Sequence, residues 1–163
     1  MIWHAISDAD WARLEACASA AEARWAVAGG DRKWNPDRHL LGCAGEWFVS
    51  SLLDLEWNPD RLGAGADGGR DLADTDVKCY RLGKLEMQYP ANQTPRATWY
   101  VVALLDYPDP RRIAIAGHTH LSELLAAPIL MRRIETRCLP LDELAPGLPP
   151  HLVLEAYQRR RRS

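Results

Sequence analysis

Four aspartates and one lysine stand close together in the stretch GADGGRDLADTDVKCY, residues 65–80. Four residues separate Asp71 from Asp76, and Lys78 follows Asp76 after a single residue. In an extended strand, residues two apart point to the same face, so Asp76 and Lys78 are expected to share a face. Val77 and Cys79 would then point to the opposite face, which predicts that this strand has one chemical side and one buried side.

A hairpin would bring the two aspartates together. If the turn has two residues, Ala73 and Asp74, or four residues, 72–75, then Asp71 and Asp76 are directly opposite one another. Opposite residues on antiparallel strands have Cβ atoms about 4.5–5.5 Å apart and point to the same face. The predicted face therefore carries both carboxylates and the lysine ammonium.

Two carboxylates at this separation repel each other, and one would tend to stay protonated unless a cation lies between them. A divalent cation removes that repulsion, and carboxylate oxygens are ligands that Mg²⁺ and Mn²⁺ prefer. The alternative is a polar hairpin tip, in which Asp74 forms the turn and Lys78 is an exposed partner. Geometry inferred from spacing alone leaves both interpretations open.

These residues resemble the motif of the PD-(D/E)XK nuclease superfamily, in which an aspartate is followed, after a gap, by Asp or Glu, any residue and Lys. Asp71 matches the first acid, and the string DVK matches the second half. The resemblance extends to DGGRD before the first acid and to Glu46 in LLGCAGEWF on a preceding helix. The later IAIAGHTHLSELL is similar to the family's strand, glycine and capped helix, so the resemblance covers roughly Leu40 to Leu125.

The resemblance implies a restriction-endonuclease-like α/β fold, with a central mixed sheet of four to five strands flanked by helices. The implied ligands of a Mg²⁺ or Mn²⁺ ion are Asp71, Asp76, the backbone carbonyl of Val77 and, directly or through water, Glu46. Lys78 would orient a metal-bound water or help to deprotonate it, and the metal would stabilise charge that develops on a phosphate. The implied catalytic set is thus Glu46, Asp71, Asp76 and Lys78, and the reaction is phosphodiester hydrolysis with DNA as the expected substrate.

Two departures from the family pattern keep other interpretations open. The gap between Asp71 and Asp76 is short for the family, and the second acid is Asp where Glu is commoner. A non-catalytic nucleic-acid-binding or assembly module that retains the nuclease fold is therefore the main alternative. A third interpretation is a regulatory or interaction domain with an incidental acidic hairpin.

Basic residues flank the motif and are candidates for contacts with backbone phosphates. They are Arg81, Lys84 and Arg96. Ordinary surface charge is an equally good explanation for each of them. The terminal QRRRRS could also touch phosphate, although a short arginine run more often forms a solvated tail.

Five further residues are secondary candidates. Asp67 could replace Asp71, but its surroundings, GADGG, fit a turn better. Gln88 or Gln93 could contact the metal site or nucleic acid. His118 and His120 are interpreted as loop histidines rather than zinc ligands.

Two helices are predicted before the motif. Ser7 followed by Asp10 resembles a capping box, which predicts a helix to about Val27. A second helix is predicted over 37–55 from an apolar stripe at helical spacing. Glu46 lies nearly opposite that stripe, so both faces of the helix must be covered, one by the sheet and one by the first helix.

The remaining segments predict a mixed sheet with helices packed on it. TWYVVALLD, residues 98–106, is a continuous apolar run that is typical of a central strand. RIAIAG predicts another strand, and THLSELLAA predicts a helix with Thr119 as cap and Glu123 in its first turns. RRIETRCLPL is interpreted as an edge strand, and APGLPPHLVLEAYQ as the start of a short final helix. The small Gly42 is expected to permit the close approach that brings the preceding helix to the hairpin.

The chain of 163 residues is predicted to be one domain, 1–163. Within it we expect an N-terminal helix and linker (1–36), a catalytic core (37–125) and a C-terminal extension (126–163). The net charge of −2 argues against a protein that coats nucleic acid non-specifically, and the sequence leaves open a homodimer or a larger complex.

The four cysteines include no Cys-x-x-Cys pair, which argues against a structural zinc site and against a disulfide framework. No run approaches 18 apolar residues, and no basic segment precedes an apolar run at the N-terminus. A cytoplasmic protein without a membrane partner is therefore expected.

Overall fold

The computed structural model describes residues 1–27, 37–57, 72 and 74–161. Asp67, Asp71 and the first strand of the expected hairpin lie outside the described residues. In chain order the elements are β1 (His4–Ala5), α1 (Asp8–Val27), α2 (Arg38–Leu52), β2 (Thr75–Arg81), β3 (Glu86–Pro90), β4 (Trp99–Asp106), β5 (Arg112–His120), α3 (Leu121–Ala126), β6 (Ile129–Met131), β7 (Glu135–Pro140), a 3₁₀ turn (Leu141–Glu143) and α4 (Pro150–Arg160).

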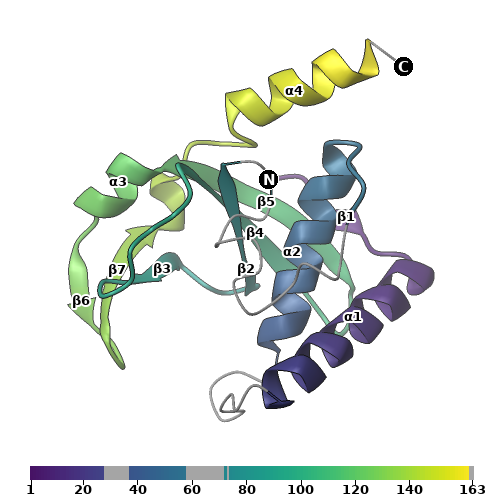
Figure 1. Cartoon of the computed structure of the whole chain (residues 1–163), viewed down its shortest axis with the longest axis horizontal. Coiled ribbons are helices and arrows are strands. Elements are labelled where there is room, and N and C mark those ends of the chain that lie inside the picture. The colour runs from purple at the N-terminus through teal and green to yellow at the C-terminus, as the bar shows by residue number, and fades with distance from the viewer. Residues whose placement is uncertain (28–36, 58–71, 73, 162–163) are drawn as a thin grey trace.

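A mixed four-stranded sheet forms the centre of the structure (Figure 1). Its strand order is β1-β5-β4-β2, with β2 parallel to β4 and the other neighbours antiparallel. An α/β fold with a mixed sheet flanked by helices is therefore confirmed. Six consecutive buried residues of β4 explain its continuous apolar run, because both faces of this strand are covered.

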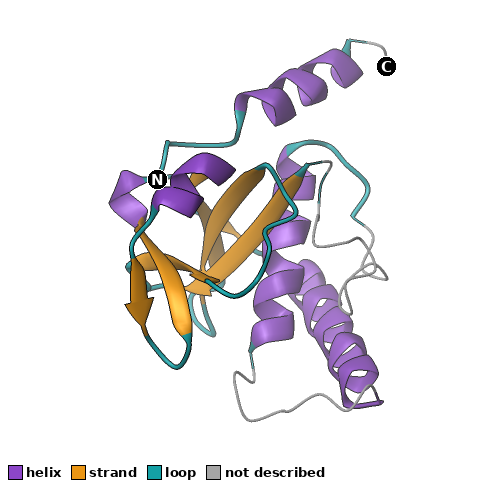
Figure 2. Ribbon diagram, turned by 60° about the vertical axis from the view of Figure 1, so that its left-hand side comes forward, coloured by secondary structure: helices purple, strands orange, loops and turns teal. Residues whose placement is uncertain are grey.

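A second sheet, which the sequence does not predict, contains three antiparallel strands in the order β3-β7-β6. The prediction of an edge strand in RRIETRCLPL is wrong, because β7 lies between β3 and β6. Figure 2 shows this smaller sheet beside the larger one, with α3 next to it. The pairing of β3 with β7 joins segments that are far apart in the sequence.

Helices α1 and α2 lie side by side on one face of the four-stranded sheet (Figure 1). The closest approach is at Gly45, where an added Cβ would lie 2.8 Å from Cβ of Cys79 and 3.1 Å from Cγ1 of Val77. The sequence assigns a close approach to Gly42, which stays a prediction, and the structure adds one at Gly45 that the sequence does not predict. The prediction that both faces of α2 are covered is confirmed, because Cys43 meets α1 while Val49 packs with residues of the sheet.

The opposite face of the four-stranded sheet packs against the second sheet and α3. Its buried cluster contains Met87, Tyr89, Ala97, Tyr100, Val102, Leu124, Ala127, Leu139 and Leu144. The two faces of β4 therefore contribute to different parts of the core. Residues of even number, such as Tyr100, face the second sheet, and residues of odd number, such as Val101, face the helices.

The helix boundaries test the predicted caps. The backbone N–H of Asp10 donates to Oγ of Ser7 at 3.1 Å, so the first cap is confirmed. The cap of α3 is His120 rather than Thr119: Nδ1 of His120 accepts from the N–H of Ser122, and the N–H of His120 donates to Glu123. His118 and His120 consequently belong to β5 and not to a loop, because the strand continues up to the cap.

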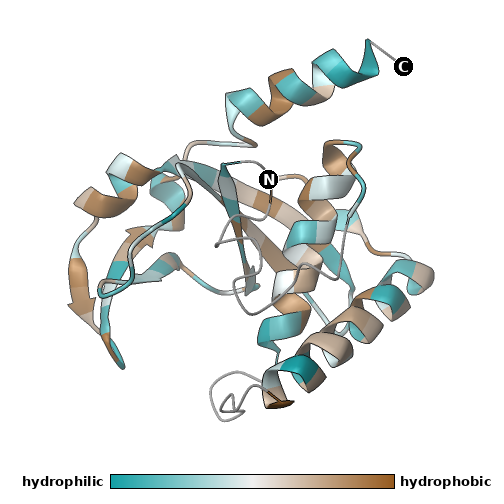
Figure 3. Cartoon of the chain, in the orientation of Figure 1, coloured by the Kyte–Doolittle hydropathy of each residue, from teal (hydrophilic) through white to brown (hydrophobic). Residues whose placement is uncertain are grey.

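The final helix, α4, begins at Pro150, as the sequence predicts for this segment. Its buried residue Leu152 packs with Val49, Leu53, Val77 and Val101 on the helix-covered face of the sheet. In Figure 3 the last turn of α4 is hydrophilic, in line with its arginines. In the part of the chain that the structure describes, no helix has the length and apolarity needed to cross a membrane.

Candidate active site

The turn before β2 has two residues, which is one of the two predicted forms. The N–H of Leu72 donates to the carbonyl of Thr75 at 3.1 Å, and the N–H of Thr75 donates to the carbonyl of Leu72 at 2.8 Å. These two bonds are typical of a tight antiparallel connection. The opposition of Asp71 and Asp76 stays a prediction, since Asp71 lies outside the described residues.

Asp74 anchors this turn to the start of β4. Its backbone carbonyl accepts from the N–H groups of Thr98 and Trp99, each at 3.1 Å, and its Oδ1 accepts from the N–H of Thr98 at 3.3 Å. The anchoring sets the parallel register, in which Thr75 lies beside Trp99. Asp74 is therefore a turn residue, as the sequence suggests, and it fixes where the following residues lie.

Asp76 and Lys78 come together as the alternation predicts. Nζ of Lys78 lies 2.7 Å from Oδ2 of Asp76, which is a short, charge-assisted contact. Asp76 is only 7% exposed, while the side chain of Lys78 is about one-third exposed. A carboxylate buried to this extent requires a charged or hydrogen-bonding partner. The turn role of Asp74 and the partly exposed side chain of Lys78 fit the alternative of a polar hairpin tip, whereas the burial of Asp76 does not follow from it.

Two tyrosines line the same face, and no local pattern in the sequence predicts either of them there. Tyr100 lies beside Asp76 in the parallel register and is fully buried. Its hydroxyl has no hydrogen-bond partner among the described residues, and burial raises the pKa of this phenol above its ordinary value. Tyr89 packs edge-on against it, with ring centroids 5.7 Å apart. Both rings exclude water around Asp76, and finding them requires the strand register.

The backbone of Val77 faces the outer edge of the sheet. Thr75 directs its N–H and carbonyl to Leu72, away from β4. Backbone groups alternate in direction along a strand, so Val77, two residues later, points its carbonyl to the same outer side. This direction is compatible with the carbonyl's expected role as a metal ligand.

Glu46 belongs to the helix that packs on the other face of β2. Helix α2 packs on Val77 and Cys79 through Gly45, which immediately precedes Glu46. Asp76 and Lys78 point from the opposite face of the same strand. Since β2 is the last strand in the order of the sheet, a site shared by Glu46, Val77 and Asp76 would lie at its outer edge.

The structure thus brings Asp76 and Lys78 into contact, while Glu46 belongs to a helix that packs on the opposite face of β2. Within the described ranges, no three His, Cys, Asp or Glu side chains are grouped as a metal site would require. Asp71 lies outside the described ranges, so this statement does not include it. The metal-binding roles of Glu46, Asp71, Asp76 and Val77 stay predictions.

Arg81 lies at the far end of β2 from Asp76, roughly 16 Å along the strand. Its guanidinium is 3.5 Å from Asp37 and lies 4.6 Å from the ring centroid of Tyr107. These contacts hold Arg81 on the helix-covered side. It is therefore poorly placed to bind a phosphate at Asp76.

Lys84 and Arg96 lie nearer to the face of β2 that carries Asp76 and Lys78, which we call the chemical face. Nζ of Lys84 is 5.8 Å from the ring centroid of Tyr80, in the turn between β2 and β3. Arg96 is exposed and precedes Thr98, which binds Asp74, by two residues. Arg96 thus lies at the same end of the sheet as Asp76 and is the best placed of the three basic candidates.

The two glutamines have structural partners. Nε2 of Gln88 donates to Glu86 at 2.7 Å, and its backbone N–H and carbonyl both bind the hydroxyl of Tyr80. Gln93 is exposed, and its N–H donates to the carbonyl of Pro90 at 3.2 Å. Gln88 therefore ties β3 to β2 rather than pointing a side chain at Asp76.

Three histidines surround Trp99 on the helix-covered face. Ring-centroid distances are 5.7 Å to His118, 4.9 Å to His120 and 5.5 Å to His151. Nδ1 of His118 is 3.1 Å from the carbonyl of Gly147, and Nε2 of His151 is 3.2 Å from Oγ1 of Thr75. These contacts join α4 and its preceding loop to the sheet, a role that the sequence does not predict.

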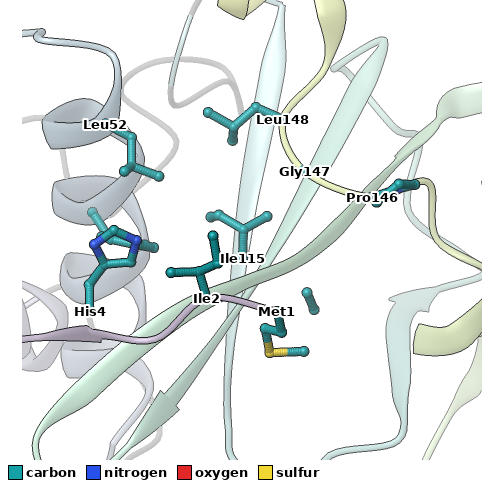
Figure 4. A pocket seen from close by; sticks show the side chains of 10 residues that line it. Met1, Ile2, His4, Leu52, Ile115, Pro146, Gly147 and Leu148 are labelled. Carbon is teal, nitrogen blue, oxygen red and sulfur yellow. The ribbon is translucent and has the colours of Figure 1, made fainter.

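A cavity of about 410 Å³ also lies on the helix-covered side (Figure 4). Its lining is mostly apolar and consists of Met1, Ile2, His4, Phe48, Leu52, Ile115, Ala116, Pro146, Gly147 and Leu148. No residue of the candidate active site contributes to it. Its apolar walls do not suit a phosphodiester.

Comparison of the chain with protein-family models, curated proteins and solved structures finds no match. The resemblance to the PD-(D/E)XK superfamily therefore rests on the residues quoted above.

Proposed function

We propose that the chain is a metal-dependent nuclease with a restriction-endonuclease-like fold, and that it hydrolyses phosphodiester bonds in DNA. The observation that supports this most directly is the contact between Asp76 and Lys78. An acid and a lysine, 2.7 Å apart, share one face of β2 directly after a two-residue turn. The acid is almost fully buried, which a surface ion pair does not require.

The donor set suits a hard divalent cation. The carboxylate of Asp76 and the edge-directed carbonyl of Val77 are oxygen ligands of the kind that Mg²⁺ and Mn²⁺ select. Asp71 and Glu46 would complete the set of metal ligands at the outer edge of β2. When bound, such an ion would provide positive charge against a phosphate and would lower the pKa of a coordinated water.

The chain's own residues would do three things. Asp76 would hold both the ion and the ammonium group of Lys78, so that Nζ stays oriented towards the reacting water. Lys78 would orient that water and exchange a proton with it at Nζ. Tyr100 and Tyr89 would keep bulk water away from Asp76, which strengthens the electrostatic interactions in the site.

A second candidate is a non-catalytic nucleic-acid-binding module. It is favoured by the position of α2, the helix that carries Glu46, which packs on the face of β2 opposite Asp76. Such a protein would retain DNA without cutting it, and Arg96 would be among its phosphate contacts.

The test is DNA cleavage with Mg²⁺ or Mn²⁺, compared with the same reaction in EDTA. We expect metal-dependent cleavage by the wild-type protein and its loss in Asp76→Asn and in Lys78→Ala. The matched control is Asp106→Asn, because Asp106 also has a basic partner at 2.8 Å, Arg112, but at the other end of β4. The control should cut DNA as the wild-type does.

Two results would contradict the nuclease proposal. Retention of DNA in a binding assay without cleavage under any metal condition would favour the non-catalytic module. Cleavage that persists in Lys78→Ala would show that another site, or a contaminating enzyme, is responsible.

A further inference from the structure

Two cysteines meet where α1 crosses α2. Sγ of Cys17, on α1, lies 2.8 Å from Sγ of Cys43, on α2. Cys17 is 8% exposed and Cys43 is fully buried, and both are present as thiols. The other two cysteines, Cys79 and Cys138, lie elsewhere, on β2 and β7.

The separation of the two sulfur atoms is close to that of a bond. A disulfide has a sulfur–sulfur distance of about 2.05 Å, so the pair needs to close by only about 0.8 Å. Both side chains already point at one another from neighbouring helices. Ala44 belongs to the same buried cluster and Ala18 packs against it, and such small side chains keep the helices close at this point.

We propose that Cys17 and Cys43 form a reversible disulfide that ties α1 to α2. This inference does not depend on the proposed nuclease activity. The oxidant would be a small disulfide such as oxidised glutathione. The thiolate of Cys17 attacks it and releases one glutathione thiolate, and the thiolate of Cys43 then displaces the second.

The step is balanced in atoms and electrons. The two cysteine sulfurs lose two electrons in total, and the disulfide bond of the oxidant gains them. The two protons lost by the cysteines end on the two glutathione thiolates. Cys17 is the entry point, because it is the only one of the pair with any exposed surface.

Burial makes the reaction slow at neutral pH. The hydrogen bond with Cys17 and the burial of the thiol both raise the pKa of Cys43 well above its ordinary value. The thiolate is the reacting form, so the rate should increase with pH. Cys79, whose pKa burial raises to about 12, should react slowly as well, and it has no cysteine partner within the described contacts.

The bond would close a loop in the chain. The cysteines are 26 positions apart, and closing a loop of this length restricts the unfolded chain. We expect an increase in Tm of roughly 5–10 °C, provided that the helices need little adjustment. Because α2 also carries Gly45 and Glu46, the bond would hold in place the helix that packs on β2.

The experiment treats the folded full-length chain with oxidised glutathione at several pH values and maps the disulfides by mass spectrometry. The expected product is a monomer that has lost two hydrogen atoms, with the peptides of Cys17 and Cys43 linked. Its Tm should be higher than that of the reduced protein and should return to the original value after reduction.

Cys138→Ser is the matched control, because Cys138 is buried on β7, in the second sheet, and should not affect the bond. Cys43→Ser should abolish the linked product. Since the map is made on the wild-type chain, the test does not depend on how that variant folds. Recovery of only thiols or mixed glutathione disulfides at Cys17, or of a link to another cysteine, would overturn the proposal.

Discussion

The two faces of β2 are built for different purposes, although they alternate along the same seven residues. Val77 and Cys79 pack so tightly on α2 that only a glycine fits opposite them. Asp76 and Lys78, on the other face, form an ion pair whose carboxylate is nearly buried. The close packing of α2 on one face fixes the position of β2. The charged groups on the other face are therefore held in a defined position.

The largest expected effect concerns the chemical face. Lys78→Ala removes the ammonium group that lies 2.7 Å from Asp76. We expect the rate of DNA cleavage to fall by about 10²–10⁴-fold, the range typical of a lost proton-transfer group. Single-turnover kinetics with Arg112→Ala as the control check this prediction. An equal loss in both variants would mean that the effect is structural, and a melting curve of each would identify it.

A substitution on the helix-covered face of β2 or on α2 should lower the free energy of unfolding. Gly45→Ala would place a Cβ 2.8 Å from Cβ of Cys79, a contact that one of the two elements must relieve by moving. We expect a loss of about 1–3 kcal/mol in the free energy of unfolding, measured with urea. Ser51→Ala, on the exposed side of the same helix, should change it by less than about 0.5 kcal/mol. A neutral Gly45→Ala would show that α2 and β2 are not in close contact.

Tyr80 links the chemical face to the second sheet. Its hydroxyl accepts from the N–H of Gln88 at 3.0 Å and donates to the carbonyl of Gln88 at 3.2 Å. Tyr80→Phe should lower the free energy of unfolding by about 1–2 kcal/mol near neutral pH, since both backbone groups lose a partner. The exposed Tyr157 provides the control, because Tyr157→Phe should have almost no effect.

The stability difference between the wild-type protein and Tyr80→Phe should depend on pH. Burial raises the pKa of Tyr80, so the folded state favours the neutral phenol. The resulting stability is complete below the ordinary value of 10.0 and is lost as the pH rises through the folded pKa. The difference between wild-type and Tyr80→Phe should therefore narrow above about pH 10. A difference that stays constant to higher pH would argue that the hydroxyl is not buried.

The smallest effect concerns α3, beside the second sheet. Hydrogen bonds from Thr119 and from the backbone of His120 lower the pKa of Glu123. Its contribution is present above the ordinary value of 4.5 and is lost as the pH falls through the folded pKa. Glu123→Ala should cost about 0.5–1 kcal/mol at neutral pH and less in acid, as measured by thermal unfolding. Glu155→Ala, which removes an exposed ion pair on α4, should cost less still.

Local patterns in the sequence predict much of this arrangement. The apolar run of β4, the cap at Ser7 and the alternation of β2 each depend on neighbouring residues, and all three are confirmed. The contact between Asp76 and Lys78 follows from a spacing of two in a strand. These features are predictable because the backbone period of a strand or helix determines them directly.

Non-local pairing could not be predicted in the same way. Tyr100 becomes a neighbour of Asp76 only because β2 and β4 pair in one parallel register. The second sheet forms because β7 pairs with β3, and neither local pattern contains that information. The close contact at Gly45 has a similar cause, because it depends on how α2 packs on Val77 and Cys79 of β2.

Manganese titration of the wild-type protein and of Asp76→Asn, by calorimetry or electron paramagnetic resonance, tests most directly whether this face of β2 binds a metal. We expect the wild-type chain to bind Mn²⁺ and Asp76→Asn to bind it with a Kd that is higher by at least roughly 10–100-fold. Mutation of a group that only hydrogen-bonds to a metal ligand already causes a loss of this size, so loss of a ligand should cause at least as much. Asp106→Asn should bind as the wild-type does. Equal binding by wild-type and Asp76→Asn, or no binding by the wild-type, would contradict a metal-dependent active site at Asp76.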